Sequence, residues 1–282
     1  MAAFLNRRWI ILIPALWLSP WPCGAHPDLI EEIARTSAEL KQSESSSLYL
    51  ERADLFRRHG EFDAALADIG AAERANHAVF NLDRARVLCD AGRAAESFEF
   101  IQTFLKSDPA NAEALIIRAR CQARLGHPEA AIADFTAGIS RCPAPGPDLF
   151  LERAKQQAAL GQLEEAVRGL DEAITNGTPL PSLQMAAIDY DRRRGAFDSA
   201  LARADGFVAR YPVKEPWLTL RAEILEQAGR ATEARQTFRQ VLAGIERYSQ
   251  LRRTLDLTKQ LEARARQGLA RTQGKPAASA SP

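Results

Sequence analysis

A glycine recurs along this chain at a nearly constant interval of 32 to 35 residues, and each copy stands in the same local pattern. An Ala precedes the glycine by seven residues, and an Ala or Ser follows it by five, as in Ala53, Gly60 and Ala65. Five of six copies are complete, and the remaining copy has Ile188 in place of its first Ala. Repetition at this period predicts stacked copies of one structural unit. The six glycines are Gly60, Gly92, Gly126, Gly161, Gly195 and Gly229.

The repeated unit is predicted to be a hairpin of two helices. Apolar residues on either side of each glycine recur at helical spacing, as in Leu48, Leu55 and Phe56. Glycine tolerates the positive φ that ends a helix, so each glycine marks a turn. The small residues that flank it allow two antiparallel helices to approach closely. Because a single hairpin cannot bury its apolar face, successive copies are expected to stack into an all-α solenoid.

These residues resemble the tetratricopeptide repeat (TPR) family. The family's unit is a 34-residue helix–turn–helix with small, Gly, small and Pro residues at these places, and the resemblance covers residues 46–246. It implies about six hairpins in one α-solenoid. The departures are local: Ile188 replaces a small residue, Pro179 and Pro181 crowd one junction, and Glu246 stands where the sixth closing Pro belongs.

The segments that flank the repeats are also predicted to be helical. Residues 26–45 are expected to form one amphipathic helix followed by a polar linker. Residues 247–270 are expected to form a terminal capping helix, of the kind that repeat arrays need for solubility. Residues 271–282 contain too few apolar side chains to fold and are predicted to be a disordered tail. The apolar positions of the terminal helix are expected to be Leu251, Leu255, Leu257 and Leu261.

Residues 1–25 have the three parts of a secretory signal peptide. Two arginines precede an apolar run at residues 9–18, and Cys23-Gly24-Ala25 provides small residues for cleavage before His26. The run is shorter than the roughly 20 apolar residues of a membrane span. We therefore expect export to a bacterial periplasm or secretion. Less favoured alternatives are an uncleaved anchor, a lipid-bearing Cys23 and a twin-arginine signal. Contact with a membrane is expected only through the leader, if it stays uncleaved.

Composition and motifs exclude several function classes. Lys plus Arg is 37 and Asp plus Glu is 36, so the chain lacks the positive excess of a nucleic-acid binder. No phosphate-binding loop, protease motif or Cys-x-x-Cys metal pair is present, so neither catalysis nor a cofactor or metal is predicted. The three cysteines beyond the leader, Cys89, Cys121 and Cys142, are interpreted as small core residues, favoured over a disulfide pair.

An arginine stands one residue before the first small position in five of the six copies. We expect these arginines to pack along the hairpin and to bond carboxylates on the second helix, such as Asp68 and Asp134, fifteen or sixteen residues later. This structural role is favoured over ligand binding. The arginines are Arg52, Arg84, Arg118, Arg153 and Arg221.

The resemblance to TPR proteins also implies a binding surface. Such arrays bind peptides along a concave face lined by the first helix of each hairpin. In that register the groove is basic in its middle, and the heads of its arginines are predicted to face solvent. The basic residues of this middle are Arg86, Arg120, Arg124 and Lys155, the acidic residues of the two ends are Asp54, Asp189 and Glu223, and the apolar floor is Leu82, Ile116, Leu151 and Met185. A simple solvated charged face is the equally weighted alternative.

The sequence therefore predicts an exported scaffold whose partner is a protein or peptide segment, with an acidic one favoured by the basic centre. It would assist assembly of an envelope or secreted complex. The chaperone-tail clamp of some TPR domains needs Lys and Asn where this chain has Leu82, Arg86, Ile116 and Arg120, so that function is disfavoured. The alternative is a structural, self-associating module without a heterologous ligand.

Overall fold

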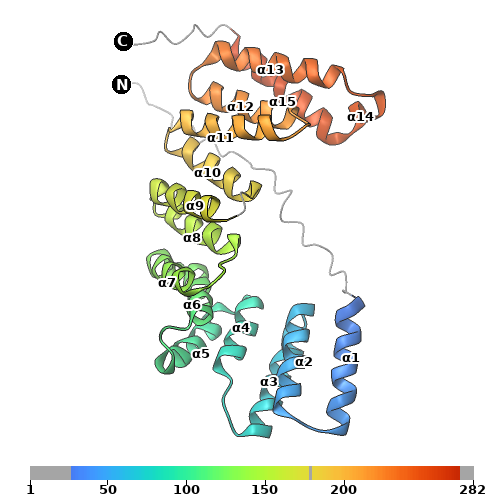
Figure 1. Ribbon diagram of the computed structural model, residues 1–282, viewed down its shortest axis with the longest axis vertical. Helices are drawn as coiled ribbons and strands as arrows, with labels where there is room; N and C mark the ends of the chain where they lie inside the picture. Colours follow the sequence, from blue (N-terminus) through green and yellow to red (C-terminus); the bar gives the residue numbers. More distant parts are fainter. Residues whose placement is uncertain (1–26, 178–179, 274–282) are drawn as a thin grey trace, which may run out of the picture. The chain divides into compact units, whose positions relative to one another are not determined.

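The computed structural model describes residues 27–177 and 180–273, and its secondary structure there is entirely helical. The chain divides into two compact units, residues 1–107 and 108–282, and each is described by itself. Figure 1 labels the helices in chain order. The predicted leader, including Ala25 and His26, and most of the predicted tail lie outside the described residues. No helix of the described part is long and apolar enough to cross a membrane.

The first unit contains one single helix followed by two hairpins. The single helix, α1, packs on α2, the first helix of the first hairpin. The helices are α1 (Pro27–Gln42), α2 (Ser46–His59), α3 (Phe62–Asn76), α4 (Asn81–Asp90) and α5 (Ala94–Ser107).

The second unit contains four hairpins and a C-terminal cap. Each of its helices from α6 to α13 packs on the next, and the last helix packs on α12 and α13. The predicted solenoid of about six hairpins, with an N-terminal helix and a C-terminal capping helix, is thus confirmed. The helices are α6 (Ala112–Arg124), α7 (Pro128–Arg141), α8 (Pro147–Ala159), α9 (Leu163–Asn176), α10 (Pro181–Arg193), α11 (Phe197–Arg210), α12 (Glu215–Gln227), α13 (Ala231–Glu246), α14 (Gln250–Thr254) and α15 (Asp256–Thr272).

The repeated glycines make the turns that the sequence predicts. All six have a left-handed backbone, with φ between 76° and 89°. At the first turn, the N–H of Gly60 donates to the carbonyl of Arg57, which satisfies one of the last carbonyls of α2. The flanking small residues lie between the two helices: the Ser97 hydroxyl donates to the carbonyl of Ala85 over 2.7 Å, which a larger side chain would prevent.

The core of each hairpin depends on a residue nine positions after the glycine. It is fully buried in every copy. Five copies place a bulky residue there, whereas the fifth places Ala204, and in that hairpin Ile188 of α10 is buried instead. The bulky residues are Ile69, Ile101, Phe135, Leu170 and Phe238.

The C-terminal segment is not the single helix that the sequence predicts, and most of its predicted apolar positions are not buried. The chain breaks between α14 and α15, and Leu255 has an extended backbone at the break. Consequently Leu251, Leu255 and Leu257 are exposed, and only Leu261 of the four predicted leucines is buried. The buried side of α15 continues through small residues, and Gly268 lies so close to the Phe238 ring that an added Cβ would collide with the ring. Two residues of the predicted tail, up to Thr272, belong to α15.

The three cysteines of the described chain occupy different environments. Cys89 on α4 and Cys121 on α6 are buried, as predicted for small core residues, whereas Cys142 just after α7 is only half-buried.

Candidate partner-binding surface

The arginine before the first small position joins the two helices of a hairpin. In the first hairpin, Arg52 donates from Nε and Nη2 to both carboxylate oxygens of Asp68, each over 2.7 Å. In the third, Arg118 holds Asp134 in the same way, over 2.6 and 2.7 Å. These hydrogen bonds raise the pKa of both guanidinium groups. The structural role predicted for these two arginines is confirmed, and each lies eight residues before its glycine with its aspartate eight after.

Two further arginines of the series take carboxylates from the preceding hairpin. Arg84 donates to Glu73 of α3 over 2.6 Å and lies 5.4 Å above the ring of Phe100. Arg221 donates to Asp205 of α11 over 2.6 Å. These partners were not predicted from the sequence, because they come from a neighbouring hairpin.

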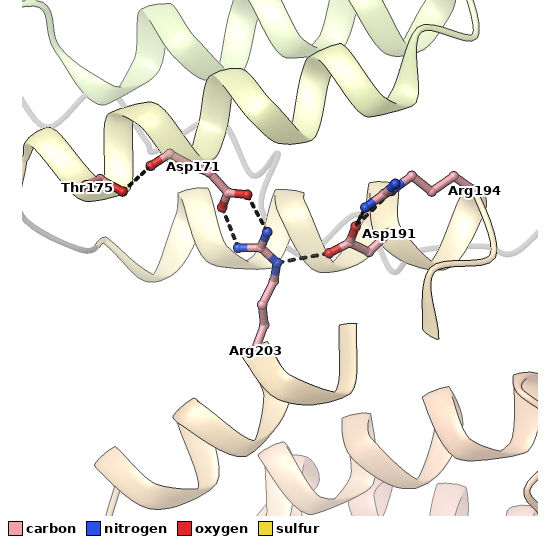
Figure 2. A network of polar contacts seen from close by, with 5 residues as sticks. All are labelled: Asp171, Thr175, Asp191, Arg194 and Arg203. Atoms are coloured by element: carbon pink, nitrogen blue, oxygen red, sulfur yellow. Dashed lines mark hydrogen bonds and ion pairs between the residues drawn. The ribbon is translucent and has the colours of Figure 1, made fainter. Parts of the chain in front are cut away.

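The fifth hairpin reverses the arrangement. It carries Arg203 on its second helix, eight residues after Gly195, where the first and third hairpins have an aspartate. Figure 2 shows that Arg203 lies between Asp171 of α9 and Asp191 of α10. Its two Nη atoms each reach an oxygen of Asp171 over 2.7 Å, and its Nε reaches Asp191 over 2.9 Å.

Asp191 is the most enclosed acid of this network. Its side chain is fully buried, and Arg194 donates to its second oxygen over 2.8 and 2.9 Å. Burial disfavours the charged form of Arg203, yet its hydrogen bonds to the two aspartates raise its pKa. This network was not predicted from the sequence, although Arg203 follows Gly195 by the same eight residues that separate Asp68 and Asp134 from their glycines.

The fourth hairpin lacks such a pair. Arg153 on α8 faces Gly169 on α9, eight residues after Gly161, and its Nη2 lies 2.6 Å from where a Cβ at Gly169 would be. In the described chain, the Nε of Arg153 is buried without a hydrogen-bond partner. Burial lowers the pKa of this guanidinium, an effect that Glu172 opposes through its charge.

The predicted groove residues of the first unit lie on α4. Leu82 and Arg86 are both half-buried. Arg86 donates from Nη1 to Asp83, one turn earlier, over 2.8 Å. Its guanidinium group is therefore paired with a carboxylate, whereas the sequence predicted a guanidinium group that faces solvent. Its charge is offset locally, because the pair lies within 2.8 Å on the same helix.

Arg120 in the second unit is also paired rather than solvent-facing. It donates from Nε and Nη2 of α6 to Glu152 of α8, over 3.0 and 2.8 Å, and from Nη2 to Asp148 over 3.2 Å. The prediction of a free basic head at this position is therefore wrong. Arg120 instead fixes two successive first helices side by side.

The remaining predicted residues of the second unit divide into exposed and packed positions. Arg124 and Lys155 are exposed, and 38% of Met185 is accessible. Ile116 is buried against Phe135, so it belongs to the core rather than to a groove floor. Leu151 is half-buried and packs against the core of the fourth and fifth hairpins.

The first helices of the second unit form a connected row. Arg120 joins α6 to α8, Arg193 of α10 donates to the carbonyl of Ala158 on α8, and Arg192 donates to Gln227 of α12. Within the described residues, no group of three His, Cys, Asp or Glu side chains is placed to hold a metal ion. The row thus offers side chains for contact.

Stacked helix hairpins with exposed residues on a row of first helices define a repeat protein of the interaction-scaffold class. Comparison with known families makes the assignment specific. The tetratricopeptide repeat family matches residues 50–103, 82–147 and 185–252, which together span more than half of the sequence. The chain belongs to the tetratricopeptide repeat family.

Solved structures of similar fold agree with this assignment. A tetratricopeptide repeat protein from Parabacteroides merdae is 16% identical, with 83% of this chain and 94% of that chain covered and a TM-score of 0.53. PilW, described as a widely conserved type IV pilus biogenesis factor, is 19% identical, with 73% and 96% covered and a TM-score of 0.54. At these identities the likeness shows the fold alone. Comparison with curated proteins gives no match.

Proposed function

We propose that this chain is an exported scaffold that binds a segment of another protein along the row of first helices and supports assembly of an envelope or secreted complex. The observation that carries the proposal is the row itself, in which α6, α8, α10 and α12 are fixed side by side by inter-repeat hydrogen bonds. Such a row presents successive equivalent positions at regular spacing, which suits an extended or helical segment.

The contact residues are proposed to be the exposed members of the predicted set. Arg124, Lys155 and Met185 stand on three successive first helices and remain accessible. Two cationic side chains and a flexible thioether suit a segment with both carboxylates and apolar side chains. Because the charges are exposed, salt should weaken binding without abolishing it.

Site-specific photo-crosslinking in the intact cell tests this surface. A benzoylphenylalanine in place of Lys155 on the first helix of the fourth hairpin should capture one heterologous protein. The matched control replaces Arg168, which is exposed on the second helix of the same hairpin, and should capture none. Equal capture at both positions, or capture at Arg168 alone, would contradict the proposed surface.

Export needs a separate test. Residues 1–30 fused to a reporter that is active only outside the cytoplasm should confer activity, and the exported chain should begin at His26 by N-terminal sequencing. A silent fusion would contradict export while leaving the binding surface untouched.

The alternative, a self-associating module, has an observation of its own. Leu251, Leu255 and Leu257 around the α14–α15 break are 79%, 54% and 64% exposed. Exposed apolar side chains that lie close together are typical of contact surfaces. Sedimentation velocity of the purified chain and of a Leu251→Ser, Leu257→Ser double variant tests this alternative. A dimer that forms in the parent chain and is lost in the variant would favour self-association.

A further inference from the structure

An arginine stands eight residues before the glycine in five of the six hairpins, and it behaves alike in the first, second, third and sixth hairpins but differently in the fourth. Arg52, Arg84, Arg118 and Arg221 each reach a carboxylate oxygen within 2.7 Å. Arg153 makes no ion pair with a carboxylate within the described residues, and Gly169 stands where the first and third hairpins have their aspartate. A carboxylate is therefore missing at one of five equivalent guanidinium groups.

Neighbouring side chains do not replace the missing carboxylate. The Arg153 guanidinium lies 5.6 Å above the ring of Phe150, but Arg52 keeps its aspartate while lying 5.6 and 5.9 Å from two rings. An aromatic platform thus accompanies the ion pair and does not substitute for it. The charge of Glu172 offsets part of the cost of burying this guanidinium, but Glu172 makes no ion pair with it, so the hydrogen bond lost at Nε is not replaced.

A second unpartnered atom lies one turn further along α8. The side-chain oxygen of Gln157 is buried without a hydrogen-bond donor within the described residues. Residues four apart on a helix lie on the same face, so Arg153 and Gln157 carry a donor and an acceptor on one side of α8. A segment that brings a carboxylate together with an N–H would satisfy both.

We propose that Arg153, with Gln157, is a binding site for the carboxylate side chain of an acidic peptide segment, which takes the place of the aspartate absent at Gly169. The two Nη atoms would receive the two oxygens, as those of Arg203 receive the oxygens of Asp171. This site lies on a different side of α8 from Lys155, since two residues correspond to a rotation of about 200°. It therefore goes beyond the proposed function and can hold or fail independently of it.

The test follows the Arg153 side-chain Nε–H by NMR in the full chain. The probe is an acetylated and amidated peptide that contains three glutamates, with the same peptide containing three glutamines as its control. The glutamate peptide should shift the Arg153 signal and leave that of Arg118 unchanged. Arg153→Gln should weaken the binding of the glutamate peptide by about tenfold, because a charge-assisted bond is lost.

Two substitutions exchange the properties of the third and fourth hairpins. Gly169→Asp should supply the carboxylate internally, raise the melting temperature and abolish the peptide-induced shift. The collision at 2.6 Å involves only the mobile end of Arg153, which can swing to the geometry of Arg118. Gly169→Asn is the neutral control and should preserve the shift. Asp134→Gly should make the Arg118 signal respond to the glutamate peptide.

Three results would overturn the proposal. The first is an Arg153 signal that ignores the glutamate peptide. The second is a signal that responds to inorganic phosphate at equal ionic strength but not to the peptide, which would make the site one for phosphate. The third is a Glu172→Gln variant that is destabilised as much as Arg153→Gln, which would show that Glu172 is the internal partner.

Discussion

The third and fifth hairpins solve the same packing problem with their residues exchanged between the two helices. The third has Arg118 on its first helix and Asp134 on its second, whereas the fifth has Asp191 on its first and Arg203 on its second. Size is exchanged as well: Ala119 faces the large Phe135 in the third, and Ile188 accompanies the small Ala204 in the fifth. Packing between the two helices of a hairpin thus requires complementary charge and volume, and it does not require a given residue at a given position.

The exchange of size yields the largest expected effect. Ile188→Ala restores the residue that the other copies have, yet it should destabilise the fifth hairpin by about 3 kcal/mol, because a buried side chain is lost and a cavity remains. Urea denaturation, with hydrogen exchange of the α10 and α11 amides to locate the loss, measures it. Ile188→Val should cost only about 1 kcal/mol. If Ile188→Ala is as stable as the parent protein, the volume of Ile188 does not compensate for the small Ala204.

The buried acid of the fifth hairpin should matter more than its counterpart in the third. Asp191→Asn removes the charge that both Arg194 and Arg203 contact, and we expect a loss of about 2 kcal/mol, moderated because Arg203 keeps Asp171. Asp134→Asn should cost about 1 kcal/mol, since Arg118 is more exposed to water. Thermal melting of both variants checks the order, and a larger loss at Asp134 would contradict it.

Reversing the pair of the third hairpin imitates the fifth. Arg118→Asp alone places a carboxylate beside Asp134, and adding Asp134→Arg should recover about 1 kcal/mol of the stability that the single change removes. A double-mutant cycle in urea gives the coupling energy. If the double variant folds no better than the single one, these arginines do not act through their ion pairs.

Two glycines on second helices should respond with opposite sign and the smallest magnitude. Gly206→Ala on α11 should stabilise by about 0.5 kcal/mol, because an added Cβ meets no atom within 4 Å and Ala favours the helix. Gly138→Ala on α7 should instead destabilise, since its Cβ would stand 2.8 Å from Ile116 and 3.2 Å from the carbonyl of Ala112. If the melting temperature rises in both variants, the two helices of the third hairpin can move apart to accept the added methyl group.

The sequence by itself determined the hairpins, because glycine turns and small contact residues act within some twenty residues of one another. From Gly60 and its two alanines alone, the turn, the two helices and the closeness of their approach follow. The ion pairs of Arg52 and Arg118 were also predictable, since both partners belong to one hairpin in a fixed register.

Only the tertiary structure decided what neighbouring repeats contribute to one another. Glu73 meets Arg84 and Glu152 meets Arg120 because neighbouring hairpins pack on each other, and a sequence period carries no information on the angle of that packing. The same stacking placed Arg120 in an ion pair instead of in solvent, and it buried Ile116. The break at Leu255 is likewise a tertiary feature: beyond it α15 packs on α12 and α13, with Gly268 against Phe238, while Leu251, Leu255 and Leu257 stay exposed. Short sequence spacings thus determine the local backbone geometry, whereas the partners of many side chains depend on how the neighbouring hairpin packs.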